Sequence, residues 1–119
     1  MKESVLSTKS YQFALRIVRL YKFIVAEKTE YVLSKQILRS GTSIGANIEE
    51  ANQGQSKADF IHKLSIAQKE AFETDYWLRL LRDTDYITKA QADSLLVDCQ
   101  ELQKLLTTSI KTAKINVKR

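Results

Sequence analysis

Apolar residues recur every three or four positions through most of the chain, a spacing that predicts amphipathic helices rather than strands. The first predicted helix covers about residues 8–26, and its apolar stripe consists of Phe13, Ala14, Ile17, Val18, Tyr21 and Ile24. The second follows Thr29, which we expect to be its N-cap, and reaches about residue 53. Its stripe consists of Leu33, Ile37, Ser40, Ile44, Ile48 and Ala51.

Two further helices are predicted with clear start signals. Ser56 is a favourable N-cap, and Asp59 falls in the first turn, where the helix dipole favours negative charge. This third helix ends near residues 82–85, and its stripe is Phe60, Leu64, Ala67, Ala71, Thr74, Leu78 and Leu81. Thr88 and Gln91 form a capping box that opens the fourth helix. The stripe of that helix is Ala92, Leu95, Leu96, Cys99, Leu102, Leu106, Ile110 and Ala113.

The three predicted connections have only about three to six residues, so each helix must fold back beside the previous one. The sequence therefore predicts an all-α fold, an antiparallel up-down-up-down four-helix bundle, in a single domain over residues 1–119. The fourth helix extends to about residue 117, some 45 Å at 1.5 Å per residue, against about 28 Å for the first. We expect its basic end, about residues 104–119, to overhang the bundle or to fray.

The composition is typical of a helical protein and indicates where in the cell the protein is found. The chain has no proline and three glycines, and it is rich in residues that favour helices. Its single cysteine, Cys99, excludes an internal disulfide and falls on a predicted core position. No apolar run is long enough to cross a bilayer, and the N-terminus does not resemble a signal peptide. We therefore expect a cytoplasmic protein.

The net charge of +5 is divided into zones along the chain. Residues 1–39 contain eight basic and three acidic side chains, residues 40–103 contain six basic and eleven acidic ones, and residues 104–119 contain five basic and none acidic. Such zones steer charged partners or sister subunits toward particular surfaces.

The third helix has more apolar residues than one bundle is expected to cover. Its two flanks carry Ile61, Ile66, Phe72, Tyr76, Trp77 and Leu80. Scattered apolar residues are common on protein surfaces, but an excess of this size favours contact between subunits. We expect these residues to form an oligomer interface, with Trp77 as an anchor, because aromatic residues dominate binding hot spots.

Basic residues form a ridge on the fourth helix. Lys104, Lys111 and Lys118 repeat every seven residues with Lys114 beside them, and Lys9, Arg16 and Arg19 fall on the outer side of the first helix. Together these seven residues are a candidate nucleic-acid-binding surface that recognises phosphates by charge and shape. A solvated lysine face is the alternative explanation.

Small residues interrupt the middle of the second helix. Gly41 and Gly45 lie four residues apart and therefore on one face, although each interior glycine costs about 1 kcal/mol relative to alanine. The spacing is typical of close packing between helices. It fits packing inside the bundle, and it also fits a groove for a neighbouring subunit or ligand.

Catalytic chemistry is poorly represented. A di-iron bundle needs several carboxylates and a Glu-x-x-His pair from each of two helices, whereas His62 is the only histidine and the nearest match is Asp59-x-x-His62. No phosphate-binding glycine loop is present. We expect a protein that is not an enzyme, with no cofactor, no metal site, no small-molecule substrate and no membrane partner.

Residues 38–50 read LRSGTSIGANIEE, and they are followed by SKADF at 56–60 and LSIA at 64–67. These segments resemble the four-helix-bundle family of 23S rRNA intervening-sequence proteins over nearly the whole chain. Many members have glycine where this chain has Ala51, and Gly-Ser where it has Gln68-Lys69, which indicates a different subgroup. The resemblance implies a bundle that assembles into a ring, typically a pentamer. A related branch, the accessory proteins of diversity-generating retroelements, looks like a basic ring that binds RNA and a reverse transcriptase.

Two functional hypotheses follow from these features. The first is a non-catalytic homo-oligomeric bundle that binds RNA or a ribonucleoprotein through its basic surfaces. The alternative is a protein-interaction scaffold that docks another polypeptide on its apolar face and has no nucleic-acid role.

Overall fold

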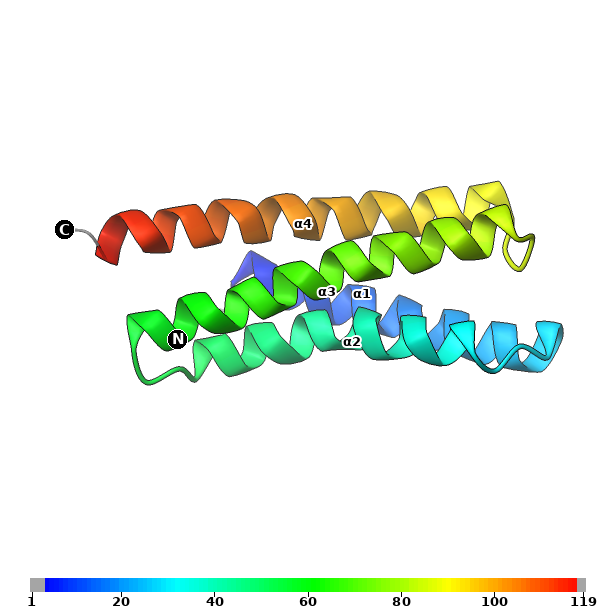
Figure 1. Cartoon of the computed structure of the whole chain (residues 1–119), viewed down its shortest axis with the longest axis horizontal. Coiled ribbons are helices and arrows are strands. Elements are labelled where there is room, and N and C mark those ends of the chain that lie inside the picture. Colours follow the sequence, from blue (N-terminus) through cyan, green and yellow to red (C-terminus); the bar gives the residue numbers. More distant parts are fainter. Residues whose placement is uncertain (1–3, 118–119) are drawn as a thin grey trace.

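The computed structural model describes residues 4–117, which form four long helices and one π-helical turn. The elements are α1 (Val5–Phe23), η1 (Ile24–Lys28), α2 (Leu33–Asn52), α3 (Lys57–Asp83) and α4 (Lys89–Val117). Successive helices lie side by side and run in opposite directions (Figure 1). The bundle measures 51 × 23 × 20 Å. The prediction of an all-α, antiparallel, up-down-up-down four-helix bundle is confirmed.

The α1 helix begins three residues before its predicted start. Ser4 is its N-cap, because its side chain accepts a hydrogen bond from the backbone N–H of Ser7. The predicted stripe was also partly wrong: Phe13, Ile17 and Ile24 are buried, but Ala14, Val18 and Tyr21 are only half-buried, while Ser10 and Leu20 are buried instead. Ser10 can be buried because it packs against Gly45 of α2, which has no side chain.

The start of α2 differs from the prediction that Thr29 caps it. Thr29 has φ 54°, a left-handed conformation that ends the π-helical turn, so it cannot also begin the next helix. The carboxylate of Glu30 caps α2 instead, accepting hydrogen bonds from the backbone N–H groups of Val32, Leu33 and Ser34 at 2.8–3.0 Å. A side chain can thus satisfy the free amides of a helix start without being a typical N-cap residue.

The predicted caps of α3 and α4 are confirmed. Ser56 Oγ accepts a hydrogen bond from the backbone N–H of Asp59 at 3.0 Å. Thr88 and Gln91 exchange two hydrogen bonds, because the backbone N–H of each donates to the side chain of the other, at 2.9 and 3.1 Å. These caps could be predicted from the sequence because the bonded residues are only three positions apart.

The core lies along the bundle axis and contains nearly all the predicted positions of α3 and α4. Every residue of the α4 stripe is buried, and on α3 only Phe60 is half-buried. One polar pair lies inside, where Thr74 Oγ1 donates to Ser40 Oγ at 3.0 Å between α3 and α2. No buried side-chain nitrogen or oxygen in residues 4–117 lacks a hydrogen-bond partner.

The helices do not end level with one another. At the end of the bundle where α2 and α3 are joined, the described part of α4 extends past the first turn of α1 (Figure 1). Ala113 is the last buried residue of α4, and Lys114, Ile115 and Asn116 are exposed. The expected overhang is therefore short, and α1 leaves part of this end uncovered.

Candidate interaction surfaces

The outer side of α3 carries apolar residues that the bundle leaves exposed. Phe72 and Tyr76 are 54% and 50% exposed, although both are large and aromatic. The other four predicted interface residues, Ile61, Ile66, Trp77 and Leu80, are half-buried. Ile61 and Trp77 pack against the edge of the core. Phe72 and Tyr76 are thus the part of the predicted interface that a single subunit covers least.

Trp77 is held in place by contacts within the subunit. Its indole Nε1 donates to Glu73 Oε2 at 3.0 Å, and its ring meets that of Tyr76 edge-on with centroids 5.1 Å apart. Glu73 also pairs with Arg39 of α2. The hydrogen bond from Trp77, followed by the pairing with Arg39, outweighs desolvation and lowers the pKa of Glu73. These contacts fix the orientation of the Trp77 ring on α3.

The basic residues in the second half of α4 are exposed and form no ion pairs within residues 4–117. Lys104, Lys111 and Lys114 are exposed, and none of them forms an ion pair with another residue between 4 and 117. Lys104 and Lys111 are two helical turns apart and so share one face. Lys118, the fourth predicted member, lies outside the described residues. We call the three described side chains the lysine strip.

The predicted basic residues of α1 do not extend the lysine strip. Lys9 pairs with Glu101 at 3.3 Å, and Arg16 pairs with Asp98 at 2.6 Å. Arg16 also donates to the hydroxyl of Ser94 at 2.8 Å. These two side chains fasten α1 to α4, where the helices are otherwise less closely packed than the other neighbouring pairs. Their charge is therefore already partly neutralised within the subunit.

Arg19 differs from Lys9 and Arg16 because it forms no ion pair within residues 4–117, although it lines a groove together with Arg16. It is exposed and lies at the rim of a groove of about 590 Å³ between α1 and α4. Leu20, Phe23 and Leu95 contribute to the lining of that groove. The six described members of the predicted basic surface thus lie in three places: an exposed strip on α4, the contact between α1 and α4, and the groove beside Arg19.

The lysine strip and the apolar surface of α3 meet between α3 and α4. Phe72 and Lys104 line the same shallow hollow, of about 290 Å³. Two hydrogen bonds fix the helices beside it: Gln68 Nε2 donates to Thr107 Oγ1 at 2.8 Å, and Gln103 Nε2 donates to Asp75 Oδ2 at 2.9 Å. A partner that covers Phe72 would therefore come close to the first lysine of the strip.

Gly41 and Gly45 face α1 within the same subunit. A Cβ on Gly41 would lie 2.7 Å from Ile17 Cγ1, whereas one on Gly45 would lie 3.4 Å from Ser10 Oγ. Gly41 is also buried, and Gly45 is half-buried beside a hollow of about 210 Å³. The sequence left open whether this pair packs inside the bundle or forms a groove for a subunit or ligand. For Gly41, packing against Ile17 inside the bundle is a sufficient explanation.

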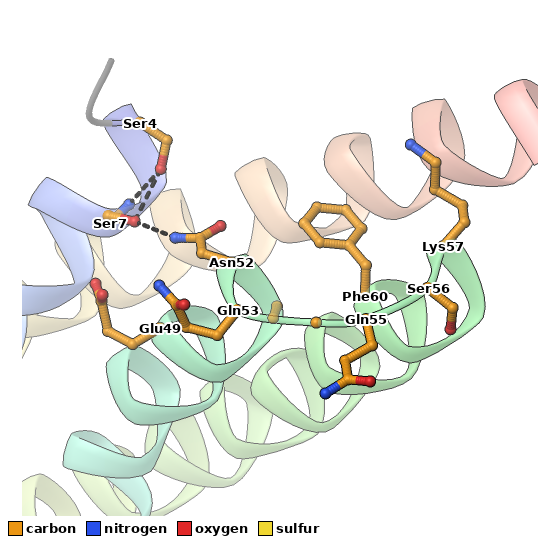
Figure 2. Close-up of a pocket in the computed structure, with 11 residues that line it drawn as sticks. Ser4, Ser7, Glu49, Asn52, Gln53, Gln55, Ser56, Lys57 and Phe60 are labelled. Carbon is orange, nitrogen blue, oxygen red and sulfur yellow. Dashed lines mark hydrogen bonds between the residues drawn. The ribbon is translucent and has the colours of Figure 1, made fainter. Parts of the chain in front are cut away.

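One cavity was not anticipated from the sequence. It has a volume of about 700 Å³ and lies between the start of α1 and the α2–α3 connection. Figure 2 shows Ser4 and Ser7 on one side of it and Asn52 and Phe60 projecting from the other. The amide-rich sequence of residues 52–55, Asn-Gln-Gly-Gln, was the available signal, but a connection of this length gives no indication of what faces it.

Groups that could carry metal or thiol chemistry are dispersed. Within residues 4–117 no three His, Cys, Asp or Glu side chains come together as a metal site, and His62 is exposed. Cys99 is buried, and desolvation raises the pKa of its thiol to about 12. In the same part of the chain, no helix combines the length and apolar character required to cross a lipid bilayer.

Fold and surface together define a class: an antiparallel four-helix bundle with exposed aromatic residues on α3 and a lysine strip on α4. The family model described as 23S rRNA-intervening sequence protein matches residues 2–108. The chain therefore belongs to the 23S rRNA-intervening sequence protein family, as its resemblance to that family predicted.

A solved structure agrees with this membership. It is the crystal structure of a protein with unknown function from the S23 ribosomal protein family of Bacteroides thetaiotaomicron, 63% identical to this chain. The similarity covers 90% of this chain and 99% of the other, with a TM-score of 0.89. No curated protein matches the chain.

Proposed function

We propose that the protein is a non-catalytic, cytoplasmic bundle that assembles with copies of itself and binds RNA through the lysine strip of α4. The observation that carries this proposal is the exposure of Lys104, Lys111 and Lys114 with no acidic partner among residues 4–117. Phosphate groups bind such side chains with release of counterions, which is the main source of sequence-independent affinity for nucleic acid.

Self-assembly supports this function because it multiplies a modest basic surface. Three lysines on one chain give weak binding, whereas several linked copies bind one RNA at high effective concentration. The exposed rings of Phe72 and Tyr76 supply apolar surface for contact between copies, and aromatic residues are favoured at such interfaces. A ring, such as the pentamer that the family resemblance implies, would bring several lysine strips together.

The family description adds a reason to choose RNA among polyanions. It names an intervening sequence of 23S rRNA, and the solved relative is assigned to a ribosomal protein family. These names describe where the proteins were placed and do not state a binding partner. Together with the lysine strip they favour RNA, or a ribonucleoprotein, as the ligand.

Charge reversal tests the proposal. Lys104→Glu, Lys111→Glu and Lys114→Glu in one chain should weaken binding of a fluorescent single-stranded RNA by at least about tenfold at low salt, since each lost phosphate contact lowers affinity. The matched control reverses Lys22, Lys28 and Lys35, which are also exposed and form no ion pairs with residues 4–117. The control changes the net charge by the same amount near the α1–α2 connection. Equal weakening in both variants would show that only net charge matters and would contradict the proposal.

The scaffold hypothesis has one observation in its favour. The groove beside Arg19 has apolar side chains, including Leu20 and Phe23, under a cationic rim, which is the chemistry that recognises an acidic amphipathic helix. A protein that stays bound through nuclease treatment and high salt, and is lost on Phe23→Glu, would favour this second function. Release by nuclease would favour the first.

A further inference from the structure

The cavity at the end of the bundle lies between the start of α1 and the α2–α3 connection. Its volume of about 700 Å³ falls within the range of roughly 300–1,000 Å³ that is usual for small-ligand sites. Ser4 and Ser7 at the start of α1 line it on one side, and residues of the α2–α3 connection, including Gln53 and Gln55, line it on the other (Figure 2). It is therefore large enough for a flat group the size of a nucleobase.

Amide side chains form one wall of this cavity. Asn52 Nδ2 donates to Ser7 Oγ at 2.9 Å, which fixes the orientation of the amide. The carbonyl oxygen of Asn52 accepts no hydrogen bond from residues 4–117, and the amide of Gln53 makes none there. The wall therefore offers an oriented acceptor and a free amide, the groups that pair with the donor and acceptor edges of a base.

An aromatic ring and a cation from the start of α3 also line the cavity. Phe60 is half-buried and projects to the same side of the connection as Asn52 (Figure 2). Lys57 Nζ lies 5.9 Å from the centroid of the Phe60 ring. Aromatic rings at such positions stack bases irrespective of sequence, and a neighbouring ammonium can contact the attached phosphate.

The cavity shares two lining residues with a second hollow against the end of α4. Lys57 and Phe60 also line a second hollow, of about 280 Å³, whose other wall comes from the last turns of α4, including Thr112 and Asn116. Lys111 and Lys114 belong to the same turns of α4. These two lysines are not among the residues that line the hollow, so a base in the cavity and phosphates on the lysine strip would be bound on different sides of α4.

We propose that this cavity binds one unpaired base of a single-stranded RNA, stacked on Phe60 and hydrogen-bonded by the amides of Asn52 and Gln53. The inference rests on the proposed RNA-binding function and adds a site that reads a base rather than a phosphate. It explains why the connection is rich in uncharged amides, because a site for phosphate alone would favour basic residues. Double-stranded RNA would not enter, since its bases are already paired and stacked.

The test compares two RNAs on the full-length protein. One is an unstructured oligoribonucleotide of about 12 nucleotides, within the site sizes of single-strand-binding folds; the other has the same backbone with abasic residues throughout. Stacking of one base is worth about 1–3 kcal/mol, so the wild-type protein should bind the first RNA about tenfold more tightly or better. Both affinities are measured by competition against one labelled RNA.

Variants test whether the preference for RNA with bases over abasic RNA depends on the cavity. Phe60→Leu keeps an apolar side chain against the core but removes the ring, and it should reduce the preference to about twofold or less without changing abasic binding. Asn52→Ala, at an exposed position, should reduce it as well while leaving the fold intact. Tyr31→Leu is the matched control, since Tyr31 is an exposed aromatic residue between α1 and α2, and it should retain the full preference.

The possible outcomes separate the two proposals. Tight binding of both RNAs with no difference between them, or a preference that survives Phe60→Leu and Asn52→Ala, would overturn the base-binding site and leave the lysine strip supported. Absence of binding to either RNA would overturn the proposed function together with the site. A preference lost in both cavity variants and kept in Tyr31→Leu is the result we expect.

Discussion

Gly41 of α2 and Ile17 of α1 lie so close together that no methyl group fits between them. A Cβ on Gly41 would be 2.7 Å from Ile17 Cγ1 and 2.8 Å from Cγ2. Ile17 is fully buried, and its β-branched side chain is stiff about χ1. The absence of a side chain at position 41 therefore sets how closely the first two helices pack.

Gly41→Ala should destabilise the protein although alanine is the better helix former. Overpacking against Ile17 costs about 1–3 kcal/mol, which exceeds the gain in helix propensity of up to about 1 kcal/mol. Gly45→Ala is the matched control: its Cβ would make only a 3.4 Å contact with Ser10 Oγ, so it should be neutral or stabilising. Urea unfolding of both variants measures the difference, and a Gly41→Ala protein as stable as Gly45→Ala would contradict this account.

Glu30→Ala should lower the free energy of unfolding by about 1 kcal/mol at pH 7, the usual contribution of a helix cap. Desolvation raises the pKa of Glu30, but hydrogen bonds from the amides of Leu33, Ser34 and Val32 outweigh it and lower the pKa overall. A lowered pKa contributes stability above the unfolded-state value of about 4.3, and this contribution is lost as the pH falls through the folded-state value. The difference between wild type and variant should therefore shrink below about pH 4.

Glu27→Ala provides the control for the cap. Glu27 is exposed in the π-helical turn and is not among the residues that hydrogen-bond to the start of α2. Its removal should change stability little at either pH. An equal, pH-independent loss in both variants would show that the carboxylate of Glu30 does not cap the helix.

The N-cap of α2 could not be predicted from the sequence, whereas those of α3 and α4 could. Ser56, and Thr88 with Gln91, were found because their signals are local and use residue types typical of caps. Glu30 was missed because a glutamate before a helix is common, and only the left-handed turn at Thr29 places it under the amides. Backbone conformation in a short connection is set by the packing of both helices, which a single sequence does not reveal.

The sequence predicted which residue types lie on the candidate surfaces, but not which of these residues contact one another. The periodicity of α3 correctly indicated that Phe72 and Tyr76 are not core residues. It could not show that Lys9 and Arg16 lie against Glu101 and Asp98, because these residues are more than 80 positions apart. The end cavity was invisible for the same reason: it depends on where α1 starts relative to the α2–α3 connection.

Cys99 should resist thiol reagents in the folded protein. Burial, together with the nearby charge of Asp75, raises the pKa of its thiol to about 12, so almost no thiolate forms at pH 8, and the side chain is fully buried. Labelling followed by absorbance should be slow in buffer and fast in urea. Rapid labelling of the native protein would indicate that α3 and α4 separate more readily than their packing implies.

Phe72→Glu with Tyr76→Glu should convert the assembled protein into a monomer of 13.6 kDa, as measured by light scattering. Carboxylates in an apolar contact lose hydration without gaining a partner. These positions are preferable to Trp77, because Trp77→Glu would also break the hydrogen bond to Glu73 within the subunit. Tyr31→Glu, on an equally exposed aromatic residue, should leave the mass unchanged. A wild-type protein of 13.6 kDa at micromolar concentration would contradict self-assembly.

The salt dependence of RNA binding tests the central claim, which is that the lysine strip contacts phosphates. For single-stranded RNA, the slope of log K against log salt decreases by about 0.7 for each phosphate contact that is lost. Replacing Lys104, Lys111 and Lys114 by glutamine should therefore reduce the slope by about 2 relative to wild type. The control with glutamine at Lys22, Lys28 and Lys35 should keep the wild-type slope. An unchanged slope in the strip variant would contradict the account.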